Sequence, residues 1–301
     1  MNLHILMTIL VKYQRTSEQS LCQGLQCVSC MRYPFTQITE AIKHKRPLTL
    51  VLPAFPAKSA NRQKTLSAKV DLGEVIGLKN LNALCRELHY HYPYGVQLII
   101  CSDGRVFNDV VLVNDDEVDI YQQGIEQIIK QHRLEYLSLF SLDDVYPMFN
   151  FSQKRAQLMR DFAEPLSQLR QRMEEETATR YQFNGMHRFI VEDQLVLKPH
   201  LSKNQIRKQA KASTYEVMRR SNAWSRLVAT HFPHALRLSI HPQPCGSEKF
   251  GIQFLPATNR WATPWHNVLL KGKDGWQLIK RQQAEELGAV LKNDHYVLEA
   301  C

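Results

Sequence analysis

Two stretches of this chain share one pattern, a short apolar run that breaks into a polar loop. They are residues 48–61, LTLVLPAFPAKSAN, and residues 96–108, VQLIICSDGRVFN. An uninterrupted apolar run of this length is typical of a strand buried on both faces of a parallel sheet. In an open α/β sheet, the loops after such strands line the ligand crevice. We therefore expect one site to contain Lys58, Ser59, Arg62, Ser102, Asp103 and Arg105.

The residues between these two stretches predict a helix. Residues 72–92 have apolar side chains at helical spacing, and Pro93 and Gly95 stop the pattern directly before the second strand. Strand, helix and strand in this order form a parallel crossover unit.

A third apolar run, residues 134–142, follows a helical pattern at 122–132 and ends at Asp143 and Asp144. At the carboxyl end of a strand, either carboxylate has two interpretations. It belongs to the same crevice, or it caps the next element.

The length of 301 residues suits one large domain or two ordinary ones. We expect a helical lead-in at residues 1–39 and a Rossmann-like domain with a mostly parallel sheet at 40–180. A long helical stretch at 151–179, broken near Pro165, closes that domain. Residues 181–301 are expected to form a smaller, mixed α+β C-terminal domain that completes the site. The fold class is therefore α/β.

The second half changes character near residue 181. Residues 189–197 resemble short strand pieces, and the capping box Ser202–Gln205 opens a helix that runs to about residue 231. A hairpin turn at 272–275 and a final helix and strand from residue 281 are also expected. The strands predicted between them are 235–241, 249–255, 266–271 and 276–279.

Two segments of this second half carry candidate site residues. Arg237, Ser239 and His241 alternate along one strand, so their side chains share a face that either lines the crevice or meets solvent. Histidine titrates near neutral pH and suits proton transfer. The segment WATPWH adds His266 and aromatic walls that include Trp265, although close tryptophans also serve as core packing.

The chain is basic, with a net charge of +9 and a pI of about 9.2. This charge favours acidic partners such as nucleic acid, a membrane surface or a phosphorylated metabolite. The cations of helix 203–231 are spread around the helix, which favours a solvated face over a nucleic-acid reader. Residues 1–11 lack the basic start and cleavage site of a signal peptide, and no run approaches the ~20 apolar residues of a membrane span.

Seven cysteines, an odd number, suggest a reducing cytoplasm. Cys22, Cys27 and Cys30 have a CxxxxCxxC spacing, but a zinc site needs a fourth ligand from elsewhere. No partner pair occurs later in the sequence, so we expect buried or free thiols and no metal.

The common nucleotide, metalloprotease and hydrolase motifs GxGxxG, the Walker loop, HExxH and GxSxG are absent. The strand-end loops instead carry cations and hydroxyls of the kind that hold a phosphate. A desolvated lysine such as Lys58 also permits Schiff-base chemistry, and Asp103 is placed to take a proton.

Several segments together resemble the isocyanide (isonitrile) synthase family, which includes proteins of paerucumarin biosynthesis and of yeast spore-wall dityrosine formation. The resemblance covers residues 40–290. The segments that carry it are LPAFPAKSANRQKTL with DLGE, SDGRVFNDVV, RLSIHP and TPWHNV.

The resemblance implies a cytoplasmic enzyme of secondary metabolism that needs no metal and no redox cofactor. The amino group of L-tyrosine or L-tryptophan would condense with the C2 ketone of ribulose 5-phosphate, and carbon–carbon cleavage would leave one carbon on nitrogen as an isocyanide. An iron- and 2-oxoglutarate-dependent oxygenase usually takes the product in this family.

We expect four catalytic residues, Lys58, Asp103, His241 and His266, for phosphosugar contact and proton transfer. The other candidates would bind the two substrates: Ser59, Arg62, Ser102, Arg105, Asp144, Arg237, Ser239 and Trp265.

Two other functions fit the residues. One is a different phosphosugar enzyme, an aldolase-type Schiff-base former acting through Lys58. The other is a basic nucleic-acid-binding protein, a rival that rests on the net charge of +9 and on the basic residues of helical segment 203–220.

Overall fold

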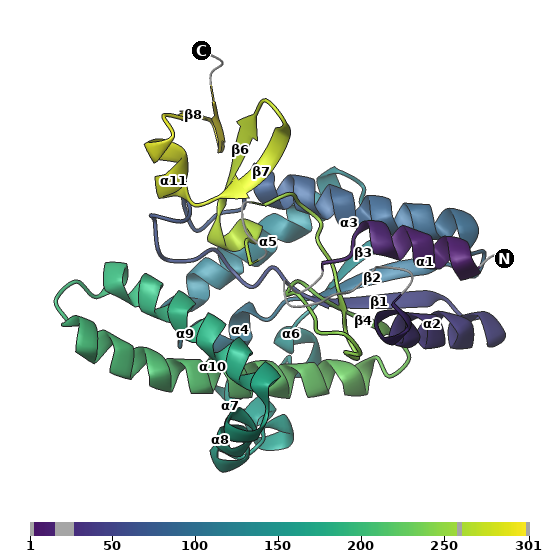
Figure 1. The fold of residues 1–301 in the computed structure, drawn as a ribbon, viewed down its shortest axis with the longest axis horizontal. Helices are drawn as coiled ribbons and strands as arrows, with labels where there is room; N and C mark the ends of the chain where they lie inside the picture. Colours follow the sequence, from purple (N-terminus) through teal and green to yellow (C-terminus); the bar gives the residue numbers. More distant parts are fainter. Residues whose placement is uncertain (1–2, 16–26, 258–260, 299–301) are drawn as a thin grey trace.

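The computed structural model describes residues 3–15, 27–257 and 261–298. A parallel five-stranded sheet with the order β3-β2-β1-β4-β5 lies at its centre (Figure 1). The predicted α/β class is confirmed. The strands are β1 (Leu48–Pro53), β2 (Val96–Cys101), β3 (Leu137–Phe140), β4 (Leu236–Ser239) and β5 (Phe250–Gly251).

Both faces of this sheet are buried, as the uninterrupted apolar runs predict. Strands β1 and β2 pair along their whole length, from Leu48 opposite Val96 to Pro53 opposite Cys101. Alternate residues belong to separate clusters, because Leu50 packs in the larger core whereas Val51 packs in the core on the other side.

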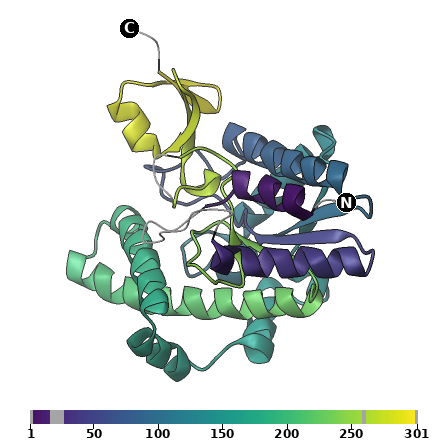
Figure 2. The same ribbon diagram turned by 45° about the vertical axis from the view of Figure 1, so that its right-hand side comes forward.

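Helices cover the two faces, as Figures 1 and 2 show. Helices α3 (Leu72–His91) and α1 (Leu3–Lys12) lie on one face, and the long α10 (Lys203–His231) crosses the other. The buried Trp224 of α10 anchors this crossing, because its Nε1 donates a hydrogen bond to the carbonyl oxygen of Cys101, 3.4 Å away. Helix α2 (Val28–Lys43) packs against β4 and β5.

Side-chain caps begin several helices where polar residues precede apolar patterns. Reciprocal capping boxes open α3, α10, α5 (Asp115–Gln131), α7 (Phe151–Phe162) and the short α6 (Leu142–Val145). The helix expected at 122–132 therefore begins earlier, at Asp115, because Asn114 caps its first turn. The predicted break near Pro165 is confirmed, since α7 ends at Phe162 and α8 (Leu166–Glu175) starts after it.

The strand pieces expected at 189–197 are wrong, because these residues form the last turns of α9 (Thr177–Leu197). Phe183 and Ile190 are buried, seven residues apart on one helical face, and pack with residues of α10. The local run of apolar residues looked like a strand, whereas the longer helical period decides the structure.

A smaller mixed sheet, β7-β6-β9-β8, lies at the C-terminal end of the described chain. The predicted hairpin is confirmed, because β6 (Val268–Gly272) and β7 (Gly275–Ile279) pair antiparallel. After α11 (Arg281–Glu286) come two strands, where one was expected. They are β8 (Val290–Lys292) and β9 (His295–Val297).

The main sheet is not confined to residues 40–180. Strands β4 and β5 come from the second half of the chain and extend the main sheet beside β1. The N-terminal helices also pack into the main core, where Leu6, Leu10 and Ile38 are buried. No helix in the described ranges is both long and apolar enough to cross a membrane.

A buried lysine holds the loop after β1. The Nζ of Lys58 lies 2.6 Å from Oδ2 of Asp71, 2.9 Å from Oε2 of Glu74 and 3.0 Å from the carbonyl oxygen of Pro264. The loop, the start of α3 and the 3-10 turn Pro264–His266 therefore meet at one ammonium group.

Replacing this lysine should strongly destabilise the fold. Lys58→Met keeps the side-chain length but leaves two buried carboxylates without their cation, so we expect a loss of about 3–5 kcal/mol in the free energy of unfolding. Urea denaturation measures the loss. Lys12→Met, which removes the exposed ion pair with Glu87, is the control and should have a far smaller effect. Equal effects of the two substitutions would contradict this role of Lys58.

Candidate active site

A cavity of about 660 Å³ opens at the carboxyl ends of β1, β2 and β4. Ala54 follows β1, Asp103 follows β2, and Ser239 and His241 come from the end of β4. Residues of α9 and of the segment 261–266 complete the lining. This is the position where open α/β sheets bind ligands, and the volume suits one or two small molecules.

Aromatic side chains form part of the cavity wall. The Trp261 ring lies 5.2 Å from the ring of His241 and 6.2 Å from that of Tyr181, measured between centroids. Phe189 and His266 meet edge to face at 4.8 Å. Such a wall favours a planar, apolar ligand group.

Asp103 places a carboxyl group with a raised pKa at the cavity. Its Oδ1 is buried and has no hydrogen-bond partner among the described residues. Burial raises the pKa of Asp103 to about 7. The next residue must be glycine, because a Cβ on Gly104 would stand 2.0 Å from the carbonyl oxygen of Pro56. The loops after β1 and β2 therefore pack closely beside a carboxyl group suited to proton transfer near neutral pH.

The two cavity histidines are neutral at pH 7. Burial, together with the charges of Arg15 and Lys249, lowers the pKa of His241 to about 4. Burial and the nearby Lys64 hold the pKa of His266 well below its usual value. The Nδ1 atoms of both rings are buried and have no hydrogen-bond partner within the described ranges. Each ring can therefore donate a hydrogen bond to a ligand or accept one from it.

Lys249 is the one cationic side chain that lines the cavity in the described part of the chain, and the sequence patterns did not identify it. It has no ion-pair partner among these residues. Burial and Arg237 lower the pKa of Lys249 to about 8. Lys249 precedes β5, which pairs only with the last two residues of β4, so position 249 lies close to the carboxyl end of that strand. Nothing in the sequence shows that β5 is so short.

The basic residues expected to hold a phosphate instead pair with other residues, and none of them lines the cavity. Arg62 donates to Ser59, Thr65 and Glu117. Arg105 pairs with Asp119 and Asp143 and lies over the Phe151 ring. The Nη2 of Arg237 donates to the hydroxyl of Ser225. Residue type suggested phosphate binding. In the structure, these guanidinium groups instead donate hydrogen bonds to nearby carboxylates, hydroxyls and carbonyls.

Lys58 also lies outside the cavity lining. Burial disfavours its charge, but Asp71 and Glu74 outweigh this effect and raise the pKa of Lys58 above its usual value. A Schiff-base lysine needs the opposite shift. The expectation that Lys58 acts as a nucleophile is therefore wrong in this structure.

Two further candidates have structural roles. The hydroxyl of Ser102 donates to the carbonyl oxygen of Phe55 and accepts from Gln122. Asp144 caps α6 by accepting from the backbone N–H of Ser141, which is the capping alternative.

Half of the predicted residues do meet at the cavity. They are Ser59, Asp103, Ser239, His241, Trp265 and His266. Trp265 joins two of the loops, because its carbonyl oxygen accepts a hydrogen bond of 2.9 Å from the backbone N–H of Ser59.

Known proteins resemble the chain over nearly its whole length. The chain is 39% identical over 281 residues to the L-tryptophan isonitrile synthase AmbI2 of Fischerella ambigua, an alignment that covers 93% of this chain and 85% of that protein. It is 37% identical over 273 residues to an L-tyrosine isonitrile synthase of Pseudomonas aeruginosa, covering 88% of this chain and 83% of the relative.

The fold also matches a solved structure. The crystal structure of the PvcA protein from Pseudomonas aeruginosa superposes with a TM-score of 0.92 and 35% sequence identity, and the match covers 98% of this chain and 99% of that one. The sequence model of one family matches residues 38–291. The chain therefore belongs to the pyoverdine/dityrosine biosynthesis protein family.

Proposed function

We propose that this protein is an isonitrile synthase, which converts the amino group of L-tyrosine or L-tryptophan into an isocyanide. The carbon donor in this proposal is ribulose 5-phosphate, and no redox cofactor takes part. One observation carries the proposal: an aromatic cavity whose described lining has a single lysine, in a chain closely similar to L-tryptophan and L-tyrosine isonitrile synthases.

The cavity lining offers two chemically different kinds of contact. Trp261, Tyr181 and Phe189 offer ring faces and edges to the side chain of an aromatic amino acid. Lys249 offers a positive charge to the phosphate of the sugar, because ammonium–phosphate contacts are charge-assisted. The residue proposed to contact the phosphate is therefore Lys249. It replaces Lys58, Arg62 and Arg105, which the sequence patterns indicated.

Three groups are suited to the proton transfers. The amino acid carries an ammonium group that must lose a proton before nitrogen attacks the C2 ketone, and Asp103, with its pKa of about 7, takes this proton. Loss of water then gives the imine. His241 and His266 are neutral and offer hydrogen bonds to the hydroxyl groups of the sugar while both carbon–carbon bonds of C2 break, which releases C1 and the phosphorylated C3–C5 fragment and leaves C2 on nitrogen.

The isocyanide product needs a second enzyme to consume it. An isocyanide on an amino acid is a reactive intermediate of secondary metabolism, and we propose that an iron- and 2-oxoglutarate-dependent oxygenase in the cytoplasm converts it further.

A second candidate is a phosphosugar enzyme that forms a Schiff base. Lys249 favours it, because an amine with a pKa of about 8 is a better nucleophile at neutral pH than an ordinary lysine. Borohydride trapping of ribulose 5-phosphate on Lys249, without carbon transfer to an amino acid, would support this candidate over isocyanide synthesis.

The primary test traces one carbon atom. Purified protein is incubated with L-tryptophan or L-tyrosine and ribulose 5-phosphate labelled with ¹³C at C2, and we expect the label in the isocyanide carbon by mass spectrometry and ¹³C NMR. Ribose 5-phosphate, which has no C2 ketone, is the control and should give no product. If neither L-tryptophan nor L-tyrosine gives labelled isocyanide, the proposal is refuted.

Replacing Asp103 should change the pH profile. In the unmodified protein, kcat/KM should rise as the pH increases through about 7, because the carboxyl group must be ionised to accept a proton. Asp103→Asn should lower kcat by about 10²–10⁴-fold and remove this rise. Asp116→Asn, at an exposed position, is the control. An unchanged profile in Asp103→Asn would exclude Asp103 as the base.

Replacing Lys249 should weaken sugar binding more than turnover. Lys249→Met should raise the KM for ribulose 5-phosphate about 10- to 100-fold at pH 7, since a charge-assisted contact contributes about 1.5–3 kcal/mol. In the unmodified protein this KM should increase above about pH 8, where the ammonium loses its proton. Lys249→Arg keeps its charge and should lack that increase. Lys273→Met, at an exposed position, should change nothing, and a Lys249→Met variant that behaves like it would contradict the assignment.

A further inference from the structure

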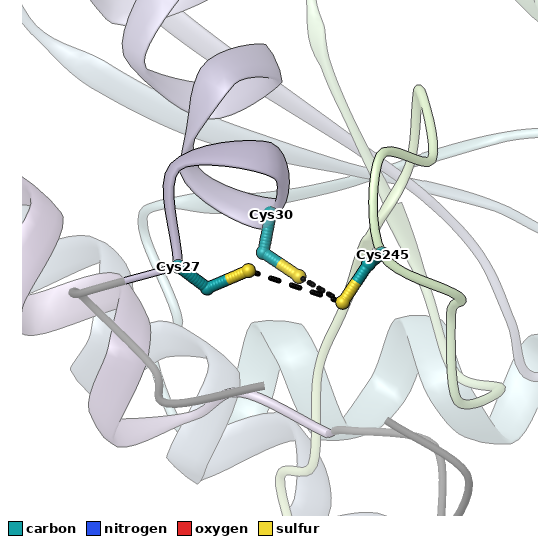
Figure 3. Close-up of side chains that lie close together, drawn as sticks. All are labelled: Cys27, Cys30 and Cys245. Atoms are coloured by element: carbon teal, nitrogen blue, oxygen red, sulfur yellow. Dashed lines mark hydrogen bonds between the residues drawn. The ribbon is translucent and has the colours of Figure 1, made fainter. Parts of the chain in front are cut away.

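Three cysteines meet outside the cavity lining (Figure 3). Cys27 and Cys30 lie at the start of α2, and Cys245 lies in the loop between β4 and β5. The Sγ of Cys245 is 3.3 Å from that of Cys30 and 3.9 Å from that of Cys27. All three sulfur atoms lie within 4.8 Å of one another.

We propose that these three thiols bind a zinc ion as thiolates. Zn–S bonds of about 2.3 Å in a tetrahedral site place the sulfur atoms about 3.8 Å apart, and the observed separations lie around this value. A disulfide between Cys30 and Cys245 would need a sulfur–sulfur distance of about 2.05 Å and would leave no role for the third sulfur.

The local sequence also fits a zinc ligand set. Cys27 and Cys30 have the CxxC spacing of such sites, and they occupy the N-terminal turn of a helix, where the partial positive charge favours anionic sulfur. Gly246 follows Cys245 with a φ of +81°, a left-handed turn in open space that presents the third sulfur. These thiolates supply three of the four tetrahedral positions. Cys22 lies outside the described residues and is not part of this assignment.

The zinc ion would join α2 to the loop that forms one wall of the cavity. This loop also carries His241, Gln243 and Lys249, all of which line the cavity. The site therefore has an architectural role: it fixes the loop that brings Lys249 to the substrates. The inference about zinc does not require the proposed reaction, whereas its effect on activity does.

Metal content tests the proposal directly. The full-length protein, purified without chelator from zinc-containing medium, should contain about one zinc per chain by inductively coupled plasma mass spectrometry. Cys30→Ser and Cys245→Ser should lose this zinc. Cys85→Ala, which removes a buried thiol distant in sequence from the cluster, is the matched control and should retain it.

A spectroscopic test does not depend on variants that fold. Wild-type protein stripped with a chelator and titrated with Co²⁺ should develop thiolate-to-cobalt charge-transfer absorption together with the d–d bands of a tetrahedral site. Absence of zinc together with absence of these bands would overturn the proposal. A Cys30–Cys245 disulfide in non-reduced peptide mapping, or unchanged zinc content in Cys245→Ser, would do the same. None of these measurements requires isocyanide synthesis, so failure of that activity leaves the zinc result intact.

Discussion

The architecture of the site depends on one buried ammonium group. Lys58 joins three segments that are distant along the chain: the loop after β1, the first turn of α3, and Pro264 in the turn beside Trp265 and His266. Burying a lysine is costly unless carboxylates and carbonyls satisfy it, and here they do. Lys58 cannot hold this position and also bind a substrate, because all three N–H donors of its ammonium group are engaged.

The order of strands in the sheet explains how distant residues form one cavity. Strand β4, formed by residues 236–239, pairs directly with β1 and thereby places His241 beside the loops after β1 and β2. Strands β4 and β5 pair over only two residues each, so Lys249 also lies near the carboxyl end of β4. Two halves of the chain therefore supply an aromatic surface, a carboxyl group and a cation to one space.

Much of the fold was predictable from local patterns. Apolar runs identified β1 and β2, the capping box identified the start of α10, and the glycine-flanked turn identified the hairpin of β6 and β7. The strand end after β2 also indicated Asp103 correctly as a cavity residue, and the alternation along residues 237–241 indicated His241. The basic residues were harder, because sequence cannot show that Arg105 has two aspartate partners or that Lys249 has none among the described residues. Cys245 likewise joins Cys27 and Cys30 only through the packing of α2 against β4 and β5.

We propose that one cavity binds an aromatic amino acid and a phosphosugar side by side. A crystal structure of the protein soaked with L-tryptophan and ribulose 5-phosphate would reveal both positions. The indole ring should lie against Trp261 and Phe189, with the phosphate within hydrogen-bond distance of the Lys249 Nζ. Density for the phosphate at Arg62 or Arg105, outside the cavity, would contradict it.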